Sequence, residues 1–303
     1  MIGIYLVTGF LGAGKTTLLR NLARLLAPQR LRLIINEFGK VGVDGALLAD
    51  MRAALDEINN GSIFCSCRFD RFEEALGDAL KDNPDAVIVE ASGLSDPSAV
   101  ERILGAQRYS GFDYKGAICV VDAKNFHKVF ATARVCRRQP AVSGLIVINK
   151  ADLVSAAELE SVKDTLRGAA PAAEIRVTSF GVMEPSWLDA LRRTGAPDAQ
   201  TEGRDLTLQK YALKIRDGMS RGELAHLIAI FAEDTYRVKG FVLLAEGLHL
   251  ADCVGPLVDI SPWEGEAPAD VNTLVVLAGK GMNPRRSIRT AMEWYPERIE
   301  KFE

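Results

Sequence analysis

The sequence predicts an α/β protein with a mostly parallel sheet, followed by a smaller α+β domain. Short apolar runs rich in β-branched residues alternate with helix-length segments through the first two-thirds of the 303 residues. Strands that are apolar on both faces and separated by helices are typical of a parallel sheet covered on both sides. The expected strands are IGIYLV, LRLIIN, AVIVEA, GAICVVD, GLIVIN and EIRVTS.

A polar segment rich in Gly and Pro divides the chain. The stretch GAPDAQTEGRDLT at residues 195–207 carries no apolar period and is typical of a linker. We therefore expect domains at residues 1–197 and 206–303. In the second domain the sequence predicts a strand at LQKYALKIR, a helix at RGELAHLIAIFAE, strands at YRVKGFVLLAEG and NTLVVLAGKG, and a last helix from about Pro284.

Composition and charge exclude several classes of function. A formal net charge of -3 provides no basic surface of the kind that nucleic acid or an anionic membrane requires, so we expect neither as a partner. No apolar run reaches the roughly 18 residues of a membrane span. The start MIGIYLVTGF is typical of a strand and lacks the pattern of a signal peptide. Five cysteines do not form a disulfide framework, and a cytoplasmic location is expected.

A glycine-rich loop joins the first expected strand to a helix. Residues 9–16, GFLGAGKT, match G-x-x-x-x-G-K-[ST] in the strand-loop-helix context that gives this motif its meaning, and they predict a P-loop NTPase fold. Backbone N–H groups of such a loop surround a β-phosphate, and the helix N-terminus favours the negative charge. Lys15 would bridge the β- and γ-phosphates, and the Thr16 hydroxyl would bind Mg²⁺. The predicted nucleotide-binding residues here are Gly9, Gly12, Ala13, Gly14, Lys15, Thr16 and Thr17.

A second site is expected where the third strand ends, in VIVEASG. Glu90 is placed to reach the Mg²⁺ through a water molecule, in a position where aspartate is more usual. Gly93 can offer its backbone N–H to a γ-phosphate. The alternative for Glu90 is a solvated carboxylate at a strand end.

The segment Asn149-Lys150-Ala151-Asp152 follows the fifth strand and predicts a preference for guanine. The Asp152 carboxylate can accept hydrogen bonds from N1–H and from the exocyclic amine of guanine, and adenine offers no such pair of donors. Two aligned bonds of this kind discriminate by orders of magnitude. Asn149 would read another edge of the base, and the Lys150 stem would pack over the ring. The expected nucleotide is therefore GTP.

Together, GFLGAGKTT, INEFG, EASGLSDP and NKADL resemble the CobW-type branch of the P-loop GTPases, whose relatives include the nickel-delivery GTPases of urease and hydrogenase maturation. The segment RVKG at residues 237–240 is similar to that family's C-terminal domain. The resemblance implies that Glu37 contacts Mg²⁺ or its waters, assisted by Asp44. Glu37 then joins Lys15 and Glu90 as an expected catalytic residue. The resemblance also places Ser179 and Gly181 at the last guanine-binding loop.

The family usually carries Asn-Gly-Cys-x-Cys-Cys between its two switches, and its members are associated with zinc, cobalt or other transition metals. This chain departs from that pattern. Counted from Asn60-Gly61, the first two family cysteines are Ser62 and Phe64, Cys65 keeps the third place, and Cys67 is additional.

Two readings of Cys65 and Cys67 follow. The pair binds one transition-metal ion, Zn²⁺ or Co²⁺, with two further ligands from elsewhere, because two thiolates supply half of a tetrahedral zinc shell. Alternatively, both are ordinary loop side chains. The scarcity of histidine, with only three in the chain, argues against a high-capacity metal store.

The expected function is a GTP-binding and slowly GTP-hydrolysing protein that couples its nucleotide state to delivery of a transition metal or metal cofactor. Its expected partners are GTP or GDP with Mg²⁺ and a client metalloprotein or cofactor enzyme, with a homodimer left open. The alternative is a GTP-dependent conformational chaperone that reactivates a metalloenzyme, a corrinoid enzyme being one example, without holding metal. An ATP-dependent kinase is disfavoured by the NKAD segment.

Overall fold

The computed structural model describes residues 1–35, 54–57, 69–91, 93, 97, 100, 103–189, 191, 209–254, 257–264, 270–279 and 282–303. The chain divides into two compact units, Met1–Gly203 and Arg204–Glu303. The first contains an α/β layer structure and the second an antiparallel sheet with helices, which confirms the predicted fold class.

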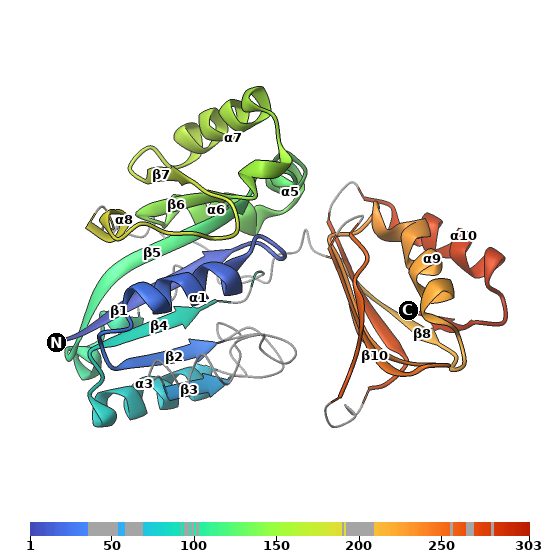
Figure 1. Cartoon of the computed structure of the whole chain (residues 1–303), viewed down its shortest axis with the longest axis horizontal. Coiled ribbons are helices and arrows are strands. Elements are labelled where there is room, and N and C mark those ends of the chain that lie inside the picture. Colours follow the sequence, from blue (N-terminus) through green and yellow to red (C-terminus); the bar gives the residue numbers. More distant parts are fainter. Residues whose placement is uncertain are drawn as a thin grey trace. The chain divides into compact units, whose positions relative to one another are not determined.

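The first unit contains a seven-stranded sheet in which every pair of neighbouring strands is parallel (Figure 1). Side chains of β1, β2, β4 and β6 are buried along nearly their whole length, as the two-sided apolar runs predict. In spatial order the strands are β3 (Ala54–Glu57), β2 (Leu31–Ile35), β4 (Ala86–Glu90), β1 (Ile2–Gly9), β5 (Phe112–Asp122), β6 (Leu145–Asn149) and β7 (Glu174–Val177).

Helices cover both faces of this sheet. On one face, Leu18, Leu19 and Leu22 of α1 share a core cluster with Trp187 of α8. On the other face, α3 packs beneath β1, β2 and β4, while α5 and α7 cover β5 and β6. Among the described residues of the unit, the helices are α1 (Lys15–Leu25), α3 (Phe69–Asp82), α5 (Phe126–Thr132), α6 (Arg134–Ala141), α7 (Ala156–Ala169) and α8 (Ser186–Asp189).

Because the sheet is parallel, the carboxyl ends of its strands meet at one edge. Val7 of β1 lies in register with Glu90 of β4, and Asp122 of β5 lies in register with Asn149 of β6. Ligands of open α/β sheets bind at this edge. The residues predicted to bind nucleotide therefore follow strands that end side by side.

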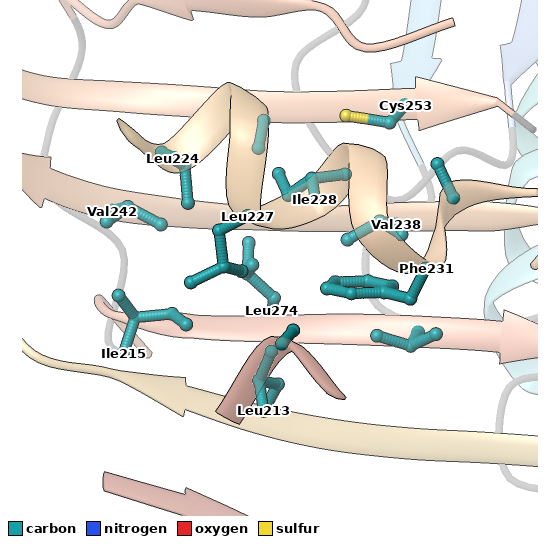
Figure 2. Close-up of a cluster of buried hydrophobic side chains, with 14 of the residues drawn as sticks. Leu213, Ile215, Leu224, Leu227, Ile228, Phe231, Val238, Val242, Cys253 and Leu274 are labelled. Atoms are coloured by element: carbon teal, nitrogen blue, oxygen red, sulfur yellow. The ribbon is translucent and has the colours of Figure 1, made fainter. Parts of the chain in front are cut away.

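The second unit is a six-stranded antiparallel sheet with two helices on one face. Leu224, Leu227, Ile228 and Phe231 of α9 point at Leu213, Val238 and Leu274 of the sheet (Figure 2). In spatial order its strands are β11 (Ile260–Pro262), β10 (Gly247–Val254), β9 (Arg237–Leu244), β12 (Thr273–Ala278), β8 (Gln209–Ile215) and β13 (Ile299–Phe302), with helices α9 (Arg221–Ala232) and α10 (Pro284–Trp294).

Both helices of this unit begin where their sequences place a start signal. Ser220 and Glu223 form a reciprocal capping box at α9, in which each side chain accepts a hydrogen bond from the other residue's backbone N–H, at 3.2 and 2.8 Å. Pro284 opens α10, where its missing N–H leaves no intrahelical bond unmade.

The segment RVKG supplies an ion-pair cluster on β9. Arg237 donates two hydrogen bonds to the Asp252 carboxylate of β10, at 2.9 and 2.7 Å, and Lys239 lies 3.5 Å from the same group. Burial raises the pKa of Asp252, but the hydrogen bonds and charges of Arg237 and Lys239 outweigh burial and hold that pKa below its usual value. The cluster joins two central strands of the second unit.

Four strands were not expected from the sequence: β3, β10, β11 and β13. The sequence of β3, Ala-Leu-Asp-Glu, consists largely of residues that strands disfavour. In β10 the buried positions are His249, Ala251 and Cys253, so the alternation lacks the large apolar side chains that mark most strands. In the part of the chain that the structure describes, no helix has both the length and the hydropathy needed to cross a bilayer.

Candidate nucleotide site

The glycine-rich loop places its glycines in conformations that other residues rarely adopt. Gly9, Gly12 and Gly14 have φ angles of 139°, 73° and 97°. Gly14 precedes α1 in the left-handed region, and a side chain there would collide with the Asn149 amide. No side chain caps α1, so its first N–H groups are not satisfied by a capping bond. Such a terminus suits an anion.

Lys15, in the first turn of α1, is oriented by the protein. The residue is 9% exposed, and its ammonium donates to the Phe10 carbonyl oxygen at 3.2 Å, which holds it over the loop. Ala13, also predicted to bind nucleotide, is buried, whereas Thr17 faces solvent.

Thr16 and Glu90 meet, although 74 residues separate them in the chain. The Thr16 hydroxyl lies 3.2 and 3.4 Å from the two Glu90 carboxylate oxygens, and Glu90 is 2% exposed. A hydroxyl and a buried carboxylate form an oxygen-rich pair of the kind that Mg²⁺ prefers. The residues present therefore fit a magnesium ion bound beside the phosphate loop.

Gly93 lies against the phosphate loop. A Cβ atom at this position would approach the Leu11 backbone N to 2.7 Å, so the close contact excludes any larger residue. The Gly93 carbonyl accepts a hydrogen bond from the Gln139 side chain at 3.2 Å.

Asn149 joins two loops. Its Nδ2 donates to the Ala13 carbonyl at 3.0 Å, and its Oδ1 accepts from the Gly181 N–H at 3.0 Å. The side chain is 2% exposed. Asn149 thus ties the phosphate loop to the loop after β7. Its amide keeps a second N–H and a second lone pair, so a contact with a base edge stays a prediction.

Lys150 is held by a residue that the sequence analysis did not identify. Its ammonium lies 2.7 Å from Asp122, a carboxylate only 7% exposed at the end of β5. Asp122 also accepts bonds from the Lys124 and Asn125 backbone N–H groups and from the Asn125 side chain. Lys150 has a left-handed backbone with φ 60°, so both its backbone and its side chain are fixed in direction.

Hydrogen bonds hold the loop after β7 to Asp152, Asn149 and Asn21, and one further bond lies within the loop. Ser179 Oγ accepts from the Asp152 N–H at 3.1 Å, and Gly181 bonds Asn149 as described above. Asn21 of α1 donates to the carbonyls of Phe180 and Gly181, at 3.2 and 2.8 Å. The Thr178 hydroxyl donates to the Val182 carbonyl at 2.8 Å. Ser179 and Gly181, predicted to lie at the base, therefore contact the NKAD segment, while the Asp152 side chain is exposed.

Three predicted residues, Glu37, Cys65 and Cys67, lie outside the described residues, and so does Asp44. Among the residues that the structure does describe, no three His, Cys, Asp or Glu side chains gather as a metal site would require. Burial raises the pKa of Cys119 to about 12 and that of Cys253 to about 11, so neither is a thiolate at neutral pH.

Asp122, Asn21 and Gln139 were missed from the sequence. Asp122 carried a signal, because an acidic residue ends a strand directly beside the NKAD strand at the ligand-binding edge of the sheet. Asn21 and Gln139 lie within helices and have no motif. Only the folded chain brings them to the site.

The loop, its helix, the Thr16–Glu90 pair and the anchored NKAD segment, gathered at the carboxyl edge of a parallel sheet, define a P-loop nucleotide-binding protein. Residues 3–176 match the model of the CobW/HypB/UreG nucleotide-binding domain. The chain belongs to the CobW/HypB/UreG family, which confirms the resemblance inferred from the motifs.

Two relatives from Escherichia coli (strain K12) illustrate the match. The chain is 36% identical to "Zinc chaperone YeiR" over 151 residues, covering 48% of this chain and 46% of that protein. It is 34% identical to "Zinc chaperone YjiA" over 169 residues, covering 52% of each. The chain thus spans about half the length of the relatives it matches.

A solved structure is also similar, the crystal structure of Zn(II)-bound YjiA GTPase from E. coli. The likeness has a TM-score of 0.49 at 20% identity and covers 97% of this chain and 98% of that one.

Proposed function

We propose that this chain binds and hydrolyses GTP and uses its nucleotide state to control delivery of a transition metal, zinc or cobalt, or of a metal cofactor to a client metalloprotein. The observation that carries the nucleotide part is the anchored NKAD segment, in which Asp122 holds Lys150 and Ser179 holds the Asp152 backbone. Both contacts orient the segment independently of the Asp152 carboxylate, which stays exposed for a ligand.

Guanine fits this arrangement better than adenine. The Asp152 carboxylate accepts from N1–H and from the exocyclic amine of guanine, whereas adenine has an unprotonated N1. The Lys150 stem, fixed at its end by Asp122, supplies an apolar surface for one face of the base. A base with the wrong donors would leave the carboxylate without partners, which is the basis of strong discrimination.

Mg²⁺-GTP should stabilise the protein far more than Mg²⁺-ATP. A ligand at a hundred times its dissociation constant raises the free energy of unfolding by about 2.7 kcal/mol. Thermal unfolding with each nucleotide over a concentration series measures the difference. Equal shifts with ATP and GTP would refute the assignment of guanine.

In hydrolysis, Lys15 would offset the charge that develops on the transferring phosphoryl group. Thr16 would bind Mg²⁺, and the neighbouring Glu90 carboxylate would reach the ion through a water molecule. Magnesium supplies charge neutralisation between the β- and γ-phosphates when bound. The 3.2 Å contact between Thr16 and Glu90 supports these two roles, since it orients the hydroxyl. Glu37 is proposed as a further contact to Mg²⁺ or its waters.

The metal part of the proposal is supported by the relatives, because YeiR and YjiA are both named zinc chaperones. The proposed metal residues of this chain are Cys65 and Cys67, which come between β3 and α3 in the sequence. The preceding strand β3 pairs with β2, which in turn pairs with β4, the strand that ends at Glu90. Strand β3, which precedes the cysteines in the sequence, therefore lies two strands away from Glu90 in the sheet.

Co²⁺ should bind the reduced protein and give thiolate-to-metal charge-transfer absorption that depends on the nucleotide. If GTP changes the metal affinity, metal must change GTP affinity by the same factor, because coupling free energies are reciprocal. The measurement is a Co²⁺ titration with GDP and with a non-hydrolysable GTP analogue.

The control for this titration is a Cys65→Ser, Cys67→Ser double variant, with Cys119→Ser as a matched change at a buried cysteine. The double variant should lose the absorption and Cys119→Ser should keep it. No absorption in the parent, or equal absorption in the double variant, would favour the conformational chaperone that holds no metal. Absorption of the same strength with GDP and with the GTP analogue would support the metal site and contradict its coupling to the nucleotide.

A further inference from the structure

Gln139 is a buried polar residue that the nucleotide motifs do not include. It lies in α6, is 1% exposed, and donates from Nε2 to the Gly93 carbonyl oxygen at 3.2 Å. The two residues are 46 positions apart in the chain. Burying an amide side chain is costly unless it is hydrogen-bonded, so this contact is a built feature of the fold.

Two contacts therefore restrain Gly93. The Leu11 backbone of the phosphate loop lies so close that a Cβ on Gly93 would approach the Leu11 N to 2.7 Å. The Gln139 side-chain amide donates to the Gly93 carbonyl oxygen. Glycine has the widest backbone freedom of any residue, so an unheld Gly93 would lose the most conformational entropy when a ligand orders it.

Gln139 is itself fixed to the body of the domain. Its carbonyl accepts from the Ser143 hydroxyl at 2.7 Å, and the next residue, Gly144, bonds to the Ala117 carbonyl of β5 at 3.1 Å. Ser143 is fully buried. Strand β6 begins immediately afterwards and runs to Asn149. Through these contacts Gly93 is connected to β5 and β6, the two strands that end at Asp122 and at the NKAD segment.

We propose that Gln139 is a positioning residue for recognition of the γ-phosphate, acting through Gly93. The inference rests on the proposed function and on the expectation from the sequence that the Gly93 N–H bonds the γ-phosphate. By restraining the Gly93 carbonyl, Gln139 reduces the freedom that Gly93 must lose when its N–H meets that phosphate. A diphosphate makes no use of this N–H. Gln139 thus raises the affinity for nucleoside triphosphate and leaves that for diphosphate unchanged.

The test is Gln139→Leu, which removes the donor and keeps most of the bulk. Calorimetry measures the dissociation constants of GDP and of a non-hydrolysable GTP analogue, both with Mg²⁺. The analogue should bind about fivefold to tenfold more weakly to the variant, the equivalent of one hydrogen bond, while GDP affinity stays the same. Gln139→Met, unbranched and without a donor, should give the same result and serves if the leucine variant folds poorly.

The matched control is Thr235→Ala, which removes a buried hydrogen bond from the Thr235 hydroxyl to the Ala232 carbonyl oxygen in the second unit and leaves Gln139 and its contacts in place. Its ratio of triphosphate to diphosphate affinity should equal that of the parent. Equal weakening of GDP and analogue by Gln139→Leu, or no change in either, would overturn the proposal.

Titrations with ADP and an ATP analogue, run in parallel, separate the role of Gln139 from the assignment of GTP. A parent that prefers adenine refutes the GTP assignment, yet its triphosphate ratio still tests Gln139. A parent that binds neither family refutes both.

Discussion

Asp152→Asn is expected to turn a guanine-selective protein into one that prefers xanthine nucleotides. The amide presents a donor where the carboxylate presented only acceptors, and xanthine carries a carbonyl where guanine carries its exocyclic amine. Guanine would meet an unfavourable donor-donor contact. A site built to bond a substrate group rejects the wrong partner by on the order of 10⁴-fold, so the affinity for GTP should fall by a factor of that size.

The fold should tolerate this change. The Asp152 side chain is exposed, and the loop holds the residue through its backbone N–H, which donates to Ser179 Oγ at 3.1 Å. The Asp152→Asn variant keeps this backbone N–H. Competition between GTP and XTP, measured by displacement of a fluorescent guanine nucleotide, gives the selectivity. Asp164→Asn, at an exposed carboxylate of α7, is the matched control and should bind as the parent does. Unchanged GTP affinity in Asp152→Asn would place the base elsewhere.

The α/β layer was predictable because its strands are buried on both faces. In β2, β4 and β6 every side chain is buried, and four of the five residues of each strand are apolar, which leaves little choice of structure. The second unit was harder to predict. Strand β10 buries His249, Ala251 and Cys253, and β13 follows its helix after only a short turn, so tertiary pairing, and not local propensity, determines both strands.

The site divides in the same way. The phosphate loop, Glu90 and the NKAD segment could be predicted because each motif places a chemical group at a fixed offset from a strand end. Their supports were not found. Asp122 holds Lys150 across 28 residues, Asn21 holds the Gly181 carbonyl across 160, and no local pattern specifies such pairs. The base-reading role of Asn149 stays a prediction, and its bonds to Ala13 and Gly181 were not predicted because they arise from the close approach of two loops.

Lys15→Ala should abolish GTP hydrolysis. The ammonium is the one charge that the phosphate-loop motif itself supplies to the γ-phosphate, and its effect is largest as charge moves in the transition state. Lys15 is 9% exposed and bonded to the Phe10 carbonyl, so its attraction for the phosphate is weakly screened. Loss of one such charge lowers turnover by on the order of 10³-fold or more.

Single-turnover hydrolysis at saturating Mg²⁺-GTP separates this loss from weaker binding. Lys163→Ala, which removes a surface ammonium paired with Glu160 in α7, is the matched control and should hydrolyse GTP at the parent rate. Thermal unfolding without nucleotide checks the fold, because alanine cannot replace the Lys15 bond to Phe10. If a folded Lys15→Ala protein hydrolysed GTP at the parent rate, Lys15 would have no role in the chemical step. An interaction that binds the ground state and the transition state equally does not change the rate at saturating substrate.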